Sequence, residues 1–249
     1  MKTIKLLGAI FFLLATATIQ AQTAEEIVAN YIENTGGADA WKSIKNMKMS
    51  GKAGFGPQEF VFTQVVTADG KMSIEIDLGG QKFVPQAFDG ESMWTTNFQS
   101  QKPEPADAEA SSNFKNESKD QIIELLGYKE KGYTIEKLED GTAEGVDCFR
   151  IKLTKKPILR DGKEEDNIRT YFIDKENFVP VMLEAVVSGG PQAGTKSQTV
   201  YSDYEEAGPV YFAYSIVSKF NGQVGQSIKI ENIEVNTEID ESIFKMPAQ

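Results

Sequence analysis

Hydrophobic and polar side chains alternate with a period of two over most of the chain after residue 45. The clearest example is residues 168–187, where two runs rich in β-branched and aromatic side chains flank the polar residues 174–177. In the second run, every other residue from Val181 to Val187 falls on one face. This pattern predicts a β-hairpin whose strands are joined by a four-residue loop.

The same alternation recurs along the chain. In residues 71–78, Met72, Ile74 and Ile76 lie in one phase and charged or hydroxyl side chains in the other. Asp69-Gly70 and Gly79-Gly80 mark the tight turns on either side. About eleven such runs, with turns about every ten residues, predict a mainly β fold with an up-and-down antiparallel sheet. A change of phase near Asn232 predicts a β-bulge.

Two segments have helical periodicity instead. Thr23 and Glu26 have the spacing of a capping box, which predicts a helix to about Asn34. A second short helix is predicted over residues 119–126, and the polar residues 100–118 before it form a loop or a poorly ordered helix. The first helix either covers a concave site as a lid or fills it as a plug. The expected lid side chains are Ile27, Val28, Tyr31, Ile122, Ile123 and Leu126.

Residues 1–21 have the pattern of a cleaved signal peptide. Lys2 and Lys5 form a positive start, an apolar run follows, and the small Ala21 precedes the expected cut before Gln22. The alternative is a membrane anchor, but no stop-transfer pattern follows. We therefore expect an exported, periplasmic protein in which residues 22–249 form a single domain.

The net charge limits the choice of partners. The full chain carries −11, and removal of Lys2 and Lys5 takes it to −13. An acidic surface disfavours nucleic acid and anionic membrane surfaces as electrostatic partners. It leaves a cationic partner open, although solubility alone explains the charge. We expect a monomer.

The chain contains few of the side chains that most often act as catalytic groups in enzymes. The chain has no histidine, which removes the commonest general base and zinc ligand. The single cysteine, Cys148, falls on the same face of its expected strand as Arg150 and Lys152. It is either a packed structural thiol or a thiol whose pKa these two cations lower. The charged turn 161–166 does not match a calcium-binding loop. We expect no enzyme activity, no cofactor and no metal.

A sheet of this width encloses more space than its own side chains easily fill. Its apolar face must be covered by helices or occupied by a ligand, and a buried acyl chain gains about 0.8 kcal/mol per methylene. The alternative is that the sheet closes tightly over the first helix and holds nothing. The expected lining of the apolar cavity is Phe60, Phe62, Met72, Ile74, Ile76, Phe149, Ile151, Val181, Leu183, Phe212, Tyr214 and Ile216.

Several stretches resemble the LolA-like family of periplasmic outer-membrane lipoprotein-sorting proteins, in a longer form of the Bacteroidetes type. The matching stretches consist of turn and core residues and cover most of residues 22–249. They are Ala24–Trp41, Phe88-Asp89-Gly90 with Trp94, Gly145–Thr154, Tyr171–Glu184 and Tyr201–Pro247, the last with Ser202-Asp203-Tyr204, Asn236, Ile239-Asp240 and Phe244.

The resemblance implies a half-open antiparallel β-barrel with covering helices and an apolar cavity for lipoprotein acyl chains or another lipid. It implies delivery from an inner-membrane release complex to an outer-membrane acceptor. Related folds also serve as sensing or protein-binding modules, which is the alternative function. Family members place an arginine from an early strand in the cavity to hold the lid. In this chain no arginine precedes Arg150, and the early strands offer Lys48 and Lys52 instead.

Overall fold

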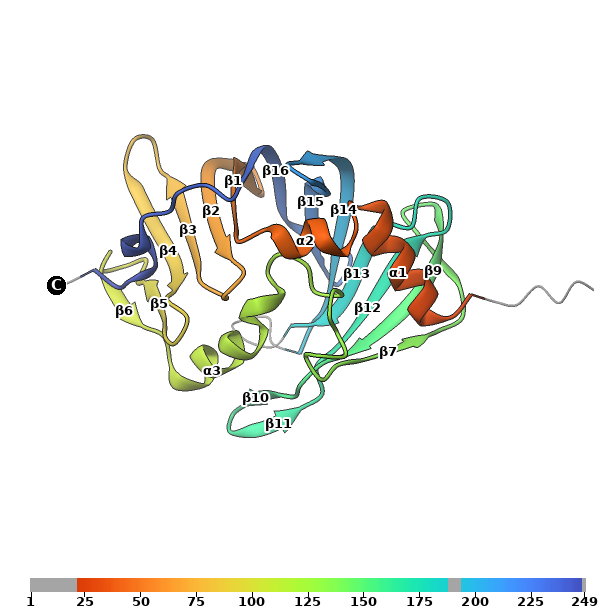
Figure 1. The fold of residues 1–249 in the computed structure, drawn as a ribbon. Helices are drawn as coiled ribbons and strands as arrows, with labels where there is room; N and C mark the ends of the chain where they lie inside the picture. The colour runs from red at the N-terminus through yellow and green to blue at the C-terminus, as the bar shows by residue number, and fades with distance from the viewer. Residues whose placement is uncertain (1–21, 188–193, 248–249) are drawn as a thin grey trace, which may run out of the picture.

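One large antiparallel sheet dominates the computed structural model, which describes residues 22–187 and 194–247 (Figure 1). The expected signal peptide lies outside the described residues. The sheet has 14 strands in the order β6-β5-β4-β3-β2-β1-β16-β15-β14-β13-β12-β9-β7, with β8 paired to β9. Among the described residues the edge strands β6 and β7 do not pair, so the curved sheet stays open between them.

The sheet confirms the predicted mainly antiparallel β fold, with more strands than the pattern indicates. The additions are three-residue strands, β6, β8, β10 and β11, which are too short to show an alternation. The strands are β1 (Asn46–Phe55), β2 (Gln58–Thr67), β3 (Met72–Asp77), β4 (Lys82–Phe88), β5 (Met93–Thr96), β6 (Pro103–Pro105), β7 (Thr134–Lys137), β8 (Gly141–Ala143), β9 (Val146–Thr154), β10 (Ile158–Arg160), β11 (Lys163–Glu165), β12 (Ile168–Asp174), β13 (Pro180–Val186), β14 (Lys196–Ala207), β15 (Val210–Phe220) and β16 (Gln223–Val235).

The predicted hairpin is formed by β12 and β13, with one shift of register. Phe172 pairs with Met182 and Ile173 pairs with Pro180, so Val181 is an extra residue on β13. Pro180 has no N–H to donate to the ladder, which favours an irregularity at this point. As a result, Val181 packs against the small cluster of Cys148, Phe172 and Met182 on the convex face. The sequence-based placement of Val181 in the cavity lining is therefore wrong.

The bulge predicted near Asn232 is confirmed in β16. Ser50 of β1 pairs with Asn232, whereas the next residue, Gly51, pairs with Ile230, so Glu231 is the extra residue. Gly51 lies tightly against this bulge. A Cβ atom at this position would lie 2.1 Å from the carbonyl oxygen of Lys229 and 2.8 Å from the Cα of Ile230.

Helices α1 (Ala24–Asn34) and α2 (Ala38–Ser43) lie across the concave face of the sheet (Figure 1). The predicted capping box is present, because the Thr23 hydroxyl accepts from the N–H of Glu26 and the Glu26 carboxylate accepts from the N–H of Thr23. Trp41 of α2 is buried, and its Nε1 donates to the Thr35 hydroxyl at 3.0 Å. None of the helices in the described part of the chain is long and apolar enough to cross a membrane.

The prediction of a helix over residues 119–126 is wrong, because the helix in this part of the chain lies earlier in the sequence. The helix is α3 (Ala108–Glu117), within the segment expected to be a loop or a poorly ordered helix, and Asp107 caps it. A 3₁₀ turn, η1 (Ser118–Asp120), follows, and residues 121–132 form turns. We call residues 118–132 the lid segment. In this segment Asp120 and Glu124 pair with Lys155, which follows β9, and Glu124 also pairs with Arg169 of β12.

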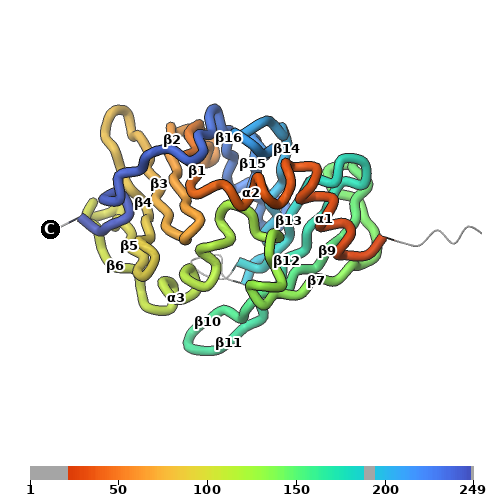
Figure 2. Tube along the Cα trace, viewed as in Figure 1, coloured from red at the N-terminus to blue at the C-terminus, as the bar shows by residue number. Residues whose placement is uncertain are grey.

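The C-terminal residues 236–247 run along the convex face. The 3₁₀ turn η3 (Glu241–Phe244) is capped by Asp240. The indole Nε1 of Trp94 donates to the carbonyl oxygen of Phe244 at 2.9 Å, which fixes this segment against β5. The two ends of the described chain therefore lie on opposite sides of the molecule (Figure 2).

The close contact at Gly51 generates a stability prediction. Gly51→Ala would push β1 away from the β16 backbone and should lower the free energy of unfolding by about 3 kcal/mol. Ser50→Ala, at the neighbouring position, should change it by less than about 0.5 kcal/mol. Urea unfolding followed by circular dichroism measures both, and equal effects would contradict this account of the bulge.

Candidate functional site

The concave face carries the apolar side chains expected there, apart from Val181. The strand register places them in one phase across the sheet, from β3 through β1 and β16 to β9. Phe62, Met72 and Ile151 are buried in the main core. The remaining members are only partly buried, and they are Phe60, Ile74, Ile76, Phe149, Leu183, Phe212, Tyr214 and Ile216.

The side chains expected to form the lid pack against this same core. Ile27, Val28 and Ile123 are buried, and Tyr31, Ile122 and Leu126 are partly buried. They come from α1 and the lid segment, so two stretches far apart in the sequence cover one face of the sheet. The structure thus brings the two groups of predicted residues together.

A cavity of about 280 Å³ remains between the lid and the sheet. This volume lies just below the usual range for ligand pockets, about 300–1,000 Å³. Its lining is more polar than expected, because tyrosines and charged side chains share it with the apolar ones. The lining includes Tyr31, Trp41, Asp120, Ile122, Ile123, Glu124, Arg169, Tyr171, Leu183, Tyr201, Tyr204 and Phe212.

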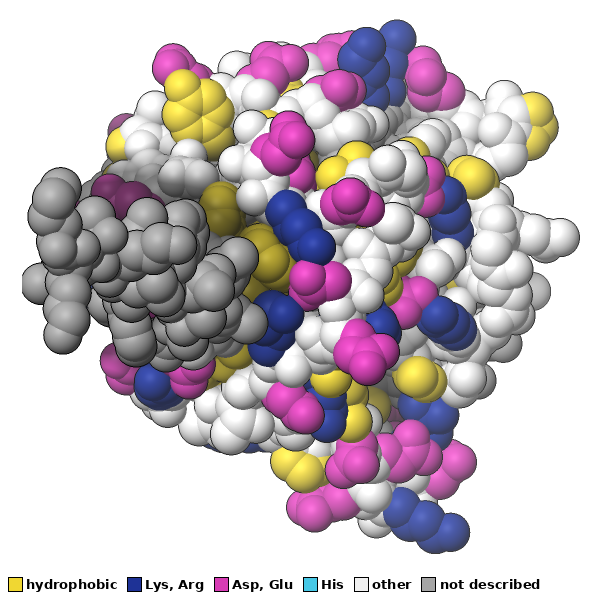
Figure 3. Space-filling model, turned by 90° about the vertical axis from the view of Figure 1, so that its right-hand side faces the viewer, with side chains coloured by type: hydrophobic (Ala, Val, Ile, Leu, Met, Phe, Trp, Pro, Cys, Tyr) yellow, Lys and Arg dark blue, Asp and Glu magenta, His cyan; other side chains and the backbone are white. Residues whose placement is uncertain are grey.

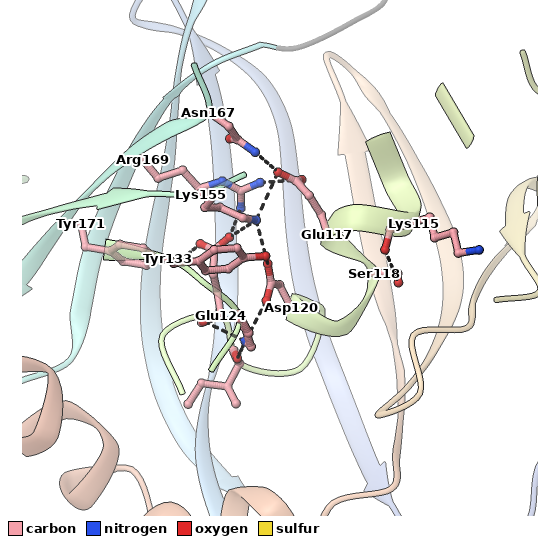
Figure 4. A network of polar contacts seen from close by, with 12 residues as sticks. Lys115, Glu117, Ser118, Asp120, Glu124, Tyr133, Lys155, Asn167, Arg169 and Tyr171 are labelled. Carbon is pink, nitrogen blue, oxygen red and sulfur yellow. Dashed lines mark hydrogen bonds and ion pairs between the residues drawn. The ribbon is translucent and has the colours of Figure 1, made fainter. Parts of the chain in front are cut away.

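A buried lysine lies beside this cavity. The side chain of Lys155, which follows β9, is only 1% exposed. Its Nζ lies 2.6 Å from Glu124, 2.8 Å from Asp120 and 3.1 Å from Glu117 (Figure 4). Burial of an unpaired ammonium is very costly, and these three carboxylates offset that cost.

Arg169 of β12, which is partly buried, is the second cation at this site. Its two terminal nitrogens each lie 2.8 Å from a carboxylate, Nη2 from Glu117 and Nη1 from Glu124. The hydroxyl of Tyr171 donates to Glu124 (Figure 4). Burial and the nearby Glu124 raise the pKa of Tyr171 well above its ordinary value, so its proton stays available for this bond.

Asp120 has further partners on the lid segment and at Tyr133, the residue before β7. The Tyr133 hydroxyl donates to it at 2.9 Å, and Lys131 lies 2.7 Å away. Burial raises the pKa values of Glu117 and Asp120, but the neighbouring cations Arg169, Lys155 and Lys131 lower them by more. Both carboxyls therefore titrate below their ordinary range. We call Glu117, Asp120 and Glu124 with Lys155 and Arg169 the lid latch.

The family resemblance implies an arginine on an early strand that holds the lid, and over the residues that the structure describes the early strands supply no cation to the lid. Lys48 and Lys52 point to the convex face, where they pair with Glu234 at 3.8 Å and Glu59 at 3.3 Å. The arginine that meets the lid is instead Arg169, from the twelfth strand of the chain. Its fork joins α3 to the lid segment through two carboxylates.

The alternative of an activated thiol at Cys148 does not hold. The residue is fully buried in the convex-face cluster, and its thiol donates to the Val146 carbonyl at 3.4 Å. Burial raises the pKa of this thiol. Arg150 lies over the Phe172 ring, and Lys152 pairs with Glu136. Cys148 is a packed structural thiol.

Sequence reasoning missed the lid latch, although two signals were present. Arg169 shares its phase in β12 with the buried Tyr171 and Ile173, where a hydrophobic residue is expected. Glu124 interrupts the run Ile122, Ile123 and Leu125. A charge inside an apolar pattern indicates a buried partner, but the sequence does not indicate which one.

The fold and the site together define an open, lidded half-barrel with an apolar concave face. No family model matches the sequence, and no curated protein matches it either. A LolA superfamily protein from Nitrosomonas europaea is similar in structure, with a TM-score of 0.54 and 12% identity over 90% of this chain and 98% of that one. A domain from Vibrio parahaemolyticus assigned to outer membrane lipoprotein sorting has a TM-score of 0.52 and 12% identity over 89% and 97%. The chain has the LolA-like fold.

The burial of Lys155 generates a second prediction. Lys155→Met leaves three carboxylates near one another with fewer cations, and it should lower the free energy of unfolding by about 3–5 kcal/mol. The adjacent Lys156 is exposed, so Lys156→Met should change stability by less than about 0.5 kcal/mol. Denaturant titration compares the two. Equal stabilities would show that the lid latch contributes nothing.

The lowered pKa values generate a third prediction. Because Glu117 and Asp120 titrate below the values of the unfolded chain, they contribute stability above about pH 4 and lose that contribution as the pH falls through their folded-state values. The stability difference between the wild type and Lys155→Met should be largest at about pH 7 and should shrink below about pH 4. A difference that is the same at every pH would contradict the assignment.

Proposed function

We propose that the protein is a non-enzymatic carrier that binds the acyl chains of lipoproteins, or of another lipid, on its concave face. One observation carries the proposal: an apolar face of the curved sheet that the helices and the lid segment cover only in part. Ile74 and Leu183 are partly buried members of this face. An acyl chain laid across it gains about 0.8 kcal/mol per methylene removed from water.

Binding of a long acyl chain requires the lid to move. The cavity of about 280 Å³ is small for such a guest. Displacement of the lid segment would join this cavity to the partly buried face formed by residues such as Ile74 and Ile216. The lid latch suits a segment that opens, because its charged groups regain hydration when they separate, whereas a purely apolar lid would expose hydrophobic surface.

The proposed setting is the periplasm, with delivery toward the outer membrane. The charged and apolar pattern of residues 1–21 supports export. The fold shared with a domain assigned to outer membrane lipoprotein sorting supports the kind of cargo. In this proposal residues 22–249 act as one domain, which receives cargo from an inner-membrane release complex and passes it to an outer-membrane acceptor.

The binding of a fluorescent fatty-acyl probe tests the carrier function. Wild-type protein should bind the probe, and Ile74→Asp or Leu183→Asp should weaken binding at least about tenfold, because the apolar face would then hold a charge. Val61→Asp is the matched control, since Val61 is exposed on the convex face of the sheet. Wild-type protein that binds no apolar probe would overturn the proposal, and so would concave-face variants that bind as well as the control.

A further inference from the structure

The turns of the sheet divide into two sets, one at each end of its strands. Because neighbouring strands are antiparallel, the β1–β2, β3–β4, β5–β6 and β15–β16 turns all lie at the same end. These turns are residues 54–58, 78–81, 97–101 and 220–226, and none contains Asp, Glu, Lys or Arg. We call these four turns the uncharged rim. Such a run of uncharged turns is unexpected in a chain with a net charge of −11.

The opposite end of the same sheet shows that this is not a general property of the turns. Three turns at that end carry charge, in Asp69 and Lys71, in Asp89 and Glu91, and in Asp174 with Lys175 and Glu176, whereas the β14–β15 turn, Gly208-Pro209, carries none. The side of the molecule that carries α1 and β9 likewise shows many acidic and basic side chains, with hydrophobic ones in small separate groups (Figure 3). Charge is thus absent from four successive turns at one end, although the β9–β12 connection at that end, residues 155–167, is charged.

Each turn of the uncharged rim presents one large hydrophobic side chain to solvent. The exposed fractions are 42% for Phe55, 44% for Leu78, 74% for Phe98 and 64% for Val224. The turns belong to successive pairs of strands, so neighbouring tips are about 10 Å apart along the sheet. Hydrophobic side chains at this spacing, on turns of Gly, Gln, Asn and Ser, do not form one continuous patch.

Part of the uncharged rim continues the apolar concave face. Phe55 and Leu78 follow the concave phase of their strands, two residues beyond Ala53 and Ile76, whereas Val224 pairs with Lys219 after a register shift in β16 and lies in the convex phase. The Phe55 ring lies 6.4 Å from that of Phe60, and the Phe98 ring lies 5.0 Å from that of Phe83. A hydrophobic guest could therefore move from the rim onto the concave face without crossing a charged turn.

We propose that the uncharged rim inserts its hydrophobic tips into the interface of a lipid bilayer. Separate tips that each enter the lipid suit a bilayer, whereas a protein partner requires a continuous, closely packed contact. Three of the cations next to the turns already have partners, since Lys52, Lys82 and Lys219 pair with Glu59, Glu75 and Glu144, which leaves Lys102 beside the turn 97–101. Attraction to anionic headgroups therefore contributes little, and docking is weak, reversible and insensitive to salt.

Flotation with phosphatidylcholine vesicles tests this docking, with a chain that starts at Gln22 because the apolar residues 1–21 would bind lipid themselves. The protein should float with the vesicles to the same extent at low and high salt. Phe55→Ser with Phe98→Ser should lower the partition coefficient by about a hundredfold, or about tenfold for each phenylalanine. Val224→Ser should also lower it, whereas Val61→Ser, at an exposed valine on the convex face, should not. Circular dichroism checks that each variant is folded.

Other outcomes overturn the proposal. Failure to bind phosphatidylcholine, or binding only to anionic vesicles with loss at high salt, would remove the hydrophobic docking. A rim variant that still binds vesicles but no longer associates with an envelope protein, or with a second copy of the chain, would make the rim a protein interface. Docking does not depend on the carrier function, because Ile74→Asp should abolish acyl-probe binding and leave flotation unchanged.

Discussion

Burial of charge between the lid segment and the sheet is the constraint on which the rest of the molecule depends. Lys155, whose side chain is 1% exposed, cannot remain there as a cation without carboxylates nearby, and the partly buried Arg169 shares two of the same carboxylates. Glu117, Asp120 and Glu124 meet this requirement only if α3 ends against β12 and residues 121–132 lie over the cavity. The position of the lid therefore follows from charge pairing as well as from hydrophobic burial.

This arrangement gives the concave face two regions of different character. Beneath α1, α2 and the lid segment the side chains are buried, and the small cavity is lined by tyrosines and charged groups. Toward the turns of β1–β2 and β3–β4 the same face is apolar, partly exposed and continuous with Phe55 and Leu78. A polar, latched region next to an open apolar one is consistent with a carrier whose cargo enters from one end of the sheet.

The sequence predicted the strands better than the segments between them. Alternation of side chains located β3, β12 and the bulge at Glu231, because each depends on local periodicity and on burial of one face. Val181 was misplaced because a shift of register beside Pro180 leaves no trace in the alternation. The lid latch was missed because its pairs join residues far apart in the chain, as Lys155 and Glu124 do, and no periodicity reports such contacts.

The composition of the lid latch also limits how the chain can change over evolutionary time. Loss of either cation leaves carboxylates near one another with fewer partners, so Lys155 and Arg169 cannot drift separately from Glu117, Asp120 and Glu124. The hydrophobic side chains of the concave face are freer, because exchange among residues of similar volume preserves their burial. Descendants of this protein should therefore keep the five charges as a group, or lose them together to apolar residues, while the surface that faces the guest diversifies.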